Sequence, residues 1–187
     1  MKHLIPPSNQ SIYNTVLLDP PWNERGGGKY KRGADHHYPI MKTPKILETV
    51  IRCPFWRNLD DDAHMYMWTT NNYLKEALWL MEALNFRYVT NIVWCKMKDG
   101  KVQNGIGQYF RGSHELCLFG IHKTGKKPTK HKTDLKNIPS AFMAPRTKHS
   151  KKPDSFYDLI ESRSQGDYLE LFARTTRKGW SSWGNEI

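Results

Sequence analysis

The sequence has few cysteines and no long apolar run, and each shortage excludes a class of protein. Its three cysteines, Cys53, Cys95 and Cys117, are odd in number and widely spaced, which suits neither a disulfide framework nor a paired-cysteine metal site. No segment approaches the roughly 18 apolar residues of a membrane span, and residues 1–10 have no apolar signal core. We therefore expect reduced thiols, no metal, no membrane partner, and a location in a reducing cytoplasm or its host-cell equivalent.

Acidic residues are scarce as well. The chain has 18 Asp and Glu against 29 Lys and Arg, a formal net charge of +11, and such an excess favours association with polyanions through phosphate neutralisation. Residues 123–152 hold ten Lys or Arg and one acid, Asp134. Ribosomal and membrane-surface proteins are also basic, so charge alone leaves the partner open. A nucleic acid is the first partner to consider.

The apolar pattern predicts alternating strands and helices. Apolar runs at 15–18, 64–69, 88–94, 115–120 and 168–172 predict buried strands, while three- and four-residue spacing over 73–84 and 156–160 predicts two amphipathic helices. This order is typical of an α/β sheet with flanking helices, and 187 residues suit a single domain, 1–187. Residues 23–43, rich in glycine, and 123–152 interrupt the pattern and are interpreted as mobile loops. Because both follow strands, we expect them to border the ligand site.

One tetrapeptide, Asp19-Pro20-Pro21-Trp22, follows the first predicted strand. A carboxylate and a proline-fixed carbonyl that each accept one hydrogen of an aromatic amine would aim the nitrogen lone pair at an incoming methyl group. The indole of Trp22 offers a flat face for an extruded base. The alternative is a loop turn with a packed tryptophan, but the position after an apolar strand favours the chemical interpretation.

Several further motifs follow in a fixed order, and together with Asp19-Pro20-Pro21-Trp22 they carry a resemblance. They are Tyr38-Pro39-Ile40-Met41, Gly107-Gln108-Tyr109-Phe110-Arg111, His114-Glu115, Lys152-Pro153-Asp154, Leu169-Glu170-Leu171-Phe172-Ala173-Arg174, Gly179-Trp180 and Trp183-Gly184-Asn185-Glu186. The chain resembles the adenine amino-methyltransferases that include the catalytic subunit of the eukaryotic messenger-RNA adenosine methyltransferase and many small bacterial and phage relatives. The resemblance to the small relatives implies a cytoplasmic location in a bacterium or phage-infected host cell. The resemblance implies a Rossmann-like fold with a mostly parallel sheet, whose catalytic motif precedes the cofactor-binding strand, and S-adenosyl-L-methionine as cofactor.

The resemblance also implies roles for individual residues. Lys152 would neutralise the cofactor carboxylate, and Arg174 and Asn185 would hold its ribose and amino-acid end. Other residues expected at the cofactor are Glu170, Leu171, Phe172 and Glu186; those expected at the substrate are Tyr38, Arg111, His114 and Glu115. Relatives often carry an aspartate about eighteen residues before the catalytic one, where this chain has only Met1, so the recognition of the cofactor adenine stays unassigned.

The resemblance leaves alternatives open. The leading prediction is methyl transfer to the N6 amine of adenine, with DNA favoured over RNA because the chain lacks the zinc fingers and added helices of RNA-directed relatives. The first alternative is a nucleic-acid-binding partner subunit without catalysis. The second is cytosine N4 methylation, although those enzymes more often begin the motif with serine. A homodimer or a heterodimer with a related subunit is compatible with the sequence.

Overall fold

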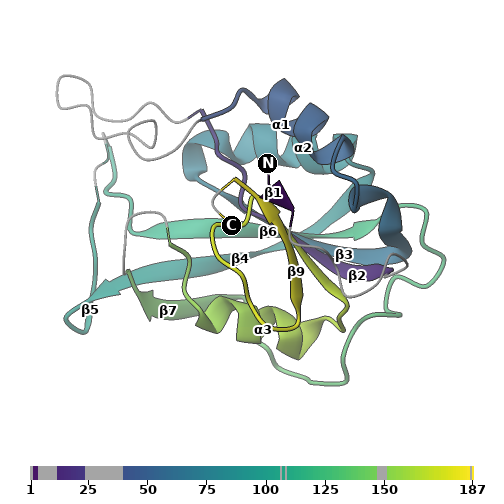
Figure 1. The fold of residues 1–187 in the computed structure, drawn as a ribbon. Coiled ribbons are helices and arrows are strands. Elements are labelled where there is room, and N and C mark those ends of the chain that lie inside the picture. Colours follow the sequence, from purple (N-terminus) through teal and green to yellow (C-terminus); the bar gives the residue numbers. More distant parts are fainter. Residues whose placement is uncertain are drawn as a thin grey trace.

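The computed structural model describes residues 2–3, 12–23, 40–105, 107, 109–146, 151–185 and 187, and its strands form one sheet. The order across the sheet is β1-β9-β8-β2-β3-β6-β4-β5, and β7 pairs with β4 outside this path (Figure 1). The strands are β1 (Lys2–His3), β2 (Tyr13–Leu18), β3 (Leu59–Thr69), β4 (Phe86–Lys98), β5 (Lys101–Val102), β6 (His114–His122), β7 (Ala141–Pro145), β8 (Tyr168–Leu171) and β9 (Trp180–Gly184).

The direction of pairing changes halfway across the sheet. From β9 through β8 and β2 to β3 the strands are parallel, whereas β6 is antiparallel to both β3 and β4. The predicted α/β, Rossmann-like fold is confirmed, with a mixed sheet. The expected parallel pairing holds among β2, β3, β8 and β9 and between β4 and β7, whereas β1–β9, β3–β6, β4–β6 and β4–β5 are antiparallel. A consequence is that the beginning of β6 lies beside the end of β3 and at the same edge of the sheet as the end of β2.

Helices cover both faces of the sheet (Figure 1). Helices α1 (Thr43–Ile51) and α2 (Leu74–Ala83) pack on one face, and α3 (Ser155–Arg163) packs on the other. Alternation along β2 sets this division, because Val16 and Leu18 face α1 and α2 while Leu17 faces α3. Short 3-10 turns, Trp56–Asn58 and Asn71–Tyr73, lead into β3 and α2.

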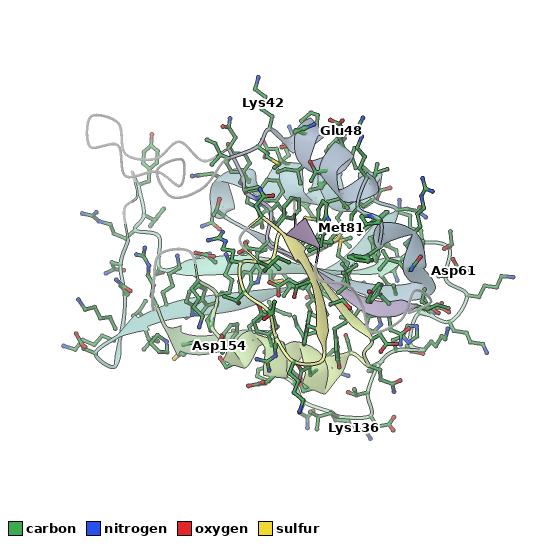
Figure 2. The ribbon with its side chains drawn as sticks, in the orientation of Figure 1. Lys42, Glu48, Asp61, Met81, Lys136 and Asp154 are labelled. Carbon is green, nitrogen blue, oxygen red and sulfur yellow. The ribbon has the colours of Figure 1, made fainter. Side chains whose placement is uncertain are left out.

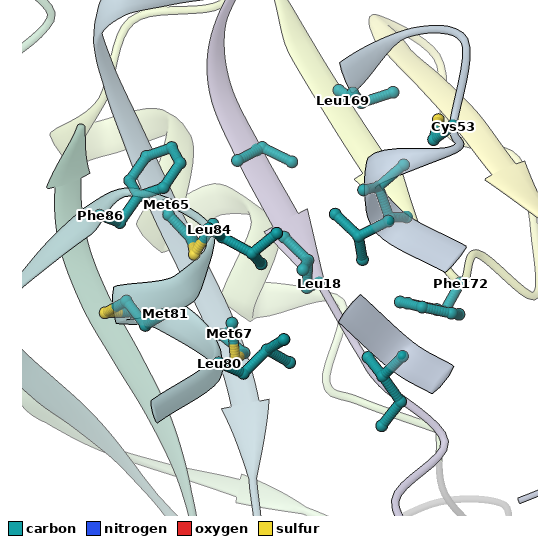
Figure 3. Close-up of a cluster of buried hydrophobic side chains, with 14 of the residues drawn as sticks. Leu18, Cys53, Met65, Met67, Leu80, Met81, Leu84, Phe86, Leu169 and Phe172 are labelled. Carbon is teal, nitrogen blue, oxygen red and sulfur yellow. The ribbon is translucent and has the colours of Figure 1, made fainter. Parts of the chain in front are cut away.

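The larger core lies between the sheet and the helix pair α1 and α2. Figure 3 shows Leu18, Met67 and Leu80 among its side chains, all of them fully buried. Burial of an aliphatic side chain of this size stabilises a fold by roughly 1.5 to 3 kcal/mol. The strand end that precedes Asp19 is therefore held firmly on this face.

The predicted strands and the two predicted helices are all present. The strand predicted at 168–172 ends at Leu171, one residue early. The sequence did not predict α1 or β9, and β7 lies within residues 123–152, which were interpreted as a mobile loop. Tyr38, Glu186 and most of the glycine-rich segment lie outside the described residues.

All three cysteines are free thiols, as expected. Burial raises the pKa of the Cys53 thiol to about 11 and raises that of Cys117 as well. Both groups therefore behave as neutral core residues. Within the described ranges, no helix has the length and apolar character needed to cross a membrane.

Candidate active site

Asp19 directly follows the carboxyl end of β2, between two parallel neighbours. Leu18 is paired with Met67 of β3 on one side and with Leu171 of β8 on the other. The Asp19 N–H donates to the carbonyl of Leu171 at 3.4 Å, which extends the pairing by one residue. Since Leu17 faces α3, the alternation of side chains turns Asp19 to the α3 face as well.

The Asp19 carboxylate is the centre of a group of charged side chains. Lys152, three residues before α3, donates to both of its oxygens, at 2.8 Å to Oδ1 and 3.0 Å to Oδ2. Arg174 approaches Oδ2 to 3.7 Å from the segment that follows β8. The Lys152 ammonium also lies 3.5 Å from Glu115, at the beginning of β6. One lysine thus joins the residue expected to be catalytic to one expected at the substrate.

Lys152 and Glu115 have shifted pKa values because each faces opposite charge in a partly buried place. Burial alone would lower the pKa of Lys152, but the charges of Asp19 and Glu115 outweigh it and raise that pKa. Burial would raise the pKa of Glu115, but Lys152 and Lys96 outweigh it and lower that pKa. Both residues are therefore ionised at neutral pH. The Lys152 ammonium also lies 5.3 Å from the centre of the Trp68 ring.

Glu170, in the middle of β8, is a buried carboxyl with one of its oxygens unsatisfied. Its Oε1 accepts a hydrogen bond from the hydroxyl of Tyr157 in α3 at 3.0 Å. Its Oε2 is buried and has no hydrogen-bond partner among the described residues. Burial, reinforced by the negative charge of Asp19, raises the pKa of Glu170 to about 7. A ligand hydroxyl would supply the donor that Oε2 lacks.

A sharp turn after β8 brings the next group of polar residues to the same edge. Phe172 has a left-handed backbone, with φ at 62°, which is strained for an aromatic residue. The chain then runs against β9, where Ala173 donates its N–H to the carbonyl of Trp183 at 3.1 Å. A Cβ on Gly184 would lie 2.0 Å from the carbonyl oxygen of Ala173, so this close approach requires glycine. Asn185, which follows Gly184, is exposed beside this turn.

The two prolines and Trp22 are held by backbone and core contacts. The Pro20 carbonyl accepts the N–H of Trp22 at 2.9 Å, and the Pro21 carbonyl accepts the N–H of Met41 at 2.7 Å. Each carbonyl oxygen has a second lone pair for another donor. The short turn therefore fixes the direction of both carbonyl groups.

The interpretation of Trp22 as a platform for a base is wrong for this structure. Its side chain is 5% exposed, its Nε1 donates to the carbonyl of Trp68 at 3.0 Å, and its ring stacks on Tyr73 with centroids 5.5 Å apart. The burial and the stacking partner leave no open ring face of the kind that stacking on a base requires. Trp22 instead anchors the end of the tetrapeptide to the core.

The residues expected at the substrate come from the beginning of β6 and the loop before it. Glu115 forms a 2.7 Å ion pair with Lys96 of β4, and His114 is half-buried beside it, paired with Cys95. Arg111 is exposed three residues earlier. Sequence reasoning missed Lys96 and Tyr157; neither belongs to a quoted motif, and only the pairing of β4 with β6 and the packing of α3 bring them to the site.

The structure divides the basic segment 123–152, which was expected as a whole to border the site. Because β6 is antiparallel to β3, residues 123–136 follow the far end of β6, beside the beginning of β3. There Lys130 and His131 contact Asp60 at 2.8 and 3.0 Å. Eleven residues of β3, at roughly 3.3 Å each, separate that edge from the end at which Asp19 lies. The expectation was wrong for residues 123–136, whereas β7 and Lys152 do lie at the site end.

Known proteins resemble the chain over almost its full length. Type II methyltransferase M.MunI of Mycoplasma sp is 28% identical over 206 aligned residues, which cover 100% of this chain and 83% of that protein. N6-methyladenosine RNA methyltransferase MTA1 of Cryphonectria parasitica is 26% identical over 94% of this chain. N(6)-adenine-specific methyltransferase METTL4 of Homo sapiens is 25% identical over 95%. The chain spans 52% of the length of MTA1 and 38% of that of METTL4. The MT-A70 family model matches residues 13–186, so the chain belongs to the MT-A70 family.

Proposed function

We propose that this chain transfers a methyl group from S-adenosyl-L-methionine to the N6 amine of an adenine in a nucleic acid, with DNA preferred over RNA. The observation that carries the proposal is the position of Asp19. It directly follows β2, is bound by Lys152, and lies between the residues that follow β8 and Glu115 at the beginning of β6. The family and the names of two of the relatives, which specify N6 of adenine, support the same reaction.

The residues around Glu170 fit the cofactor. A ribose hydroxyl would donate to the unsatisfied Oε2 of Glu170. Lys152 and Arg174 offer cations to the methionine carboxylate, and Asn185 and the neighbouring Glu186 complete the expected set. Leu171 and Phe172 would border its adenine. When bound, the cofactor supplies a methyl group on a positively charged sulfur.

The protein's own part in the reaction is to orient the amine. A carboxylate offers about four acceptor positions, so Asp19 can accept an amine hydrogen while it keeps its bonds to Lys152. The Pro20 carbonyl, whose direction the Trp22 N–H fixes at 2.9 Å, would accept the second hydrogen. The lone pair then faces the methyl group, and a carboxylate near the nitrogen stabilises the positive charge that develops during transfer.

The test compares Asp19→Ala and Asp19→Asn with the natural chain. Labelled S-adenosylmethionine is incubated with DNA or RNA oligonucleotides, and the products are identified by nucleoside mass spectrometry. Both variants should lose N6-methyladenosine or its deoxy form, while calorimetry should still detect binding of S-adenosylhomocysteine. Wild-type turnover in Asp19→Ala would refute the role of this carboxylate.

Two other outcomes for the natural chain would replace the proposal. Failure to bind either form of the cofactor would identify a partner subunit without catalysis. N4-methylcytosine as the product would assign the cytosine reaction instead. The choice between DNA and RNA follows from which oligonucleotide is methylated.

A further inference from the structure

Next to the site, the sheet extends outward into a small platform with exposed cations. The last residues of β4 pair with β5 and with β7, and hydrogen bonds from the Lys96 N–H to Ser113 and from the Arg146 N–H to Met97 fasten the neighbouring loops. We call the exposed cations of this extension the basic platform; they are Lys98, Lys101, Arg111, Arg146 and Lys151.

The basic platform lies at the site end of the sheet. Figure 1 shows β5 and β7 at the opposite end from the beginning of β3, and Figure 2 shows Asp61, near that beginning, far from β5. The Lys96 ammonium connects the platform to the site through its 2.7 Å contact with Glu115. A polyanion bound on the platform therefore lies beside the group of charges around Asp19.

Two aromatic side chains project from the loop at the rim of this platform. Tyr109 is 94% exposed and Phe110 is 91% exposed, more than any other large hydrophobic residue among those described. Scattered apolar residues are ordinary on a surface, but two adjacent, fully exposed rings are an unusual concentration. The rings have almost no contact with the rest of the described protein, so their apolar faces are free for a ligand.

Two close backbone approaches lie on either side of the exposed pair. The Gly105 N–H donates to the carbonyl of Gly112 at 2.8 Å, which closes the loop at its base. A Cβ on Gly107 would lie 1.8 Å from the carbonyl oxygen of Phe110, so this close approach of two backbone segments requires glycine. Phe110 is five residues from Glu115, which limits the distance between their Cα atoms to about 18 Å.

We propose that Tyr109 and Phe110 stack on bases of the nucleic acid that neighbour the target adenine, while the basic platform binds its phosphates. Positive charge and flat, unpacked rings occur together here, which is the combination that proteins use to bind single-stranded nucleic acid. Asp99 is the one acid in the segments 96–102, 109–114 and 141–146, which carry the two rings and every cation of the platform except Lys151. Lys151 forms an exposed ion pair with Asp154 at 3.0 Å. The inference rests on the proposed function only in naming adenine as the target.

The test measures binding rather than methyl transfer. Fluorescence anisotropy reports the affinity for a mixed-sequence single-stranded DNA 20-mer and for an oligonucleotide of equal length without bases, with S-adenosylhomocysteine present. The double variant Tyr109→Ala/Phe110→Ala should bind the normal oligonucleotide at least tenfold more weakly, and the base-free one as the natural chain does. Tyr109→Leu/Phe110→Leu, which keeps apolar bulk without flat rings, should show the same selective loss.

Matched variants separate stacking from charge. Lys98→Ala/Lys101→Ala/Arg146→Ala should weaken binding of both oligonucleotides. The slope of log affinity against log salt concentration should become shallower by about 0.7 for each phosphate that is no longer neutralised. Lys126→Ala/Lys127→Ala/Lys136→Ala removes equal charge from the far edge and should have a much smaller effect. Trp79→Ala, a half-exposed aromatic on α2, is the control for the rings.

Three results would overturn the inference. These are unchanged affinity in both aromatic double variants, an equal loss of affinity for the normal and base-free oligonucleotides, and a changed oligomeric state in sedimentation, which would assign the rings to an interface between proteins. Absence of methylation by the natural chain, in contrast, would refute the proposed function and leave this binding result intact.

Discussion

Replacing Lys152 with methionine is expected to destabilise the fold by about 3 kcal/mol at neutral pH. The ammonium lies 2.8 and 3.5 Å from two carboxylates, and the three side chains are only 14 to 19% exposed. With an effective dielectric constant near 20, each contact is worth about 5 to 6 kcal/mol before desolvation. Loss of the cation alone leaves Asp19 and Glu115 desolvated and facing each other, which costs about 3 to 5 kcal/mol. Because Lys96 still pairs with Glu115 and Arg174 still lies near Asp19, we expect a destabilisation at the lower end of this range.

This destabilisation depends on pH in a defined direction. The pKa of Glu115 is lowered in the folded chain, so its stabilising contribution is present above its unfolded pKa of about 4.3 and is lost as the pH falls through the lower folded value. Without Lys152, Glu115 loses a cation that lowers its pKa and therefore gains a proton more readily. The stability difference between Lys152→Met and the natural chain should therefore narrow between pH 7.5 and pH 4.5.

Urea unfolding followed by tryptophan fluorescence at the two pH values measures this difference. Lys151→Met, which removes an exposed ion pair with Asp154, is the control and should stay within about 0.5 kcal/mol of the natural chain. Asp19→Asn combined with Lys152→Met should recover part of the loss. An equal difference at both pH values would refute the electrostatic reasoning.

Three further substitutions test other parts of the structure. Glu170→Gln should become more stable relative to the natural chain as the pH rises from 5 to 8. The pKa of Glu170 is raised to about 7 in the folded chain, so ionisation over this range lowers the free energy of unfolding of the natural chain. Urea midpoints across this range measure the difference. Gly184→Ala should cost about 1 to 3 kcal/mol and weaken S-adenosylhomocysteine binding in calorimetry, since its Cβ would clash with Ala173. Phe156→Ala, at a fully buried ring, should cost about 3 to 5 kcal/mol in urea unfolding, and Leu159→Ala, only partly buried, clearly less.

Local patterns in the sequence predicted most of the strands. Leu17 and Leu18 form part of an unbroken apolar run, and the prolines after Asp19 mark its end, so both β2 and its terminus were readable. Helix α1 was missed because it is short and rich in β-branched residues, a composition that does not favour a helix. Those residues are Thr43, Ile46, Thr49, Val50 and Ile51. Packing against the sheet stabilises the helix instead.

Contacts that depend on long-range pairing could not be predicted from the sequence. Lys96 reaches Glu115 because β4 and β6 pair, and Lys152 reaches Asp19 across 133 positions. The misplacement of residues 123–136 has the same origin, since no local pattern indicates that β6 runs against β3. Trp22 was misread because an aromatic residue after a strand is equally compatible with a ligand surface and with the core.

The reversed direction of β6 has a consequence for how the protein could be altered. Glu115 and the loop that carries Tyr109 and Phe110 reach the site at the start of β6. Asp19, Phe172 and Asn185, in contrast, follow the ends of other strands. The segment 103–113 can therefore be exchanged for one of another length while β8 and β9 keep their register. Under the proposed function, the loop before β6 is assigned to the target and the segments after β8 and β9 to the methyl donor, so a graft of residues 103–113 is expected to change target preference and to leave binding of S-adenosylhomocysteine unchanged.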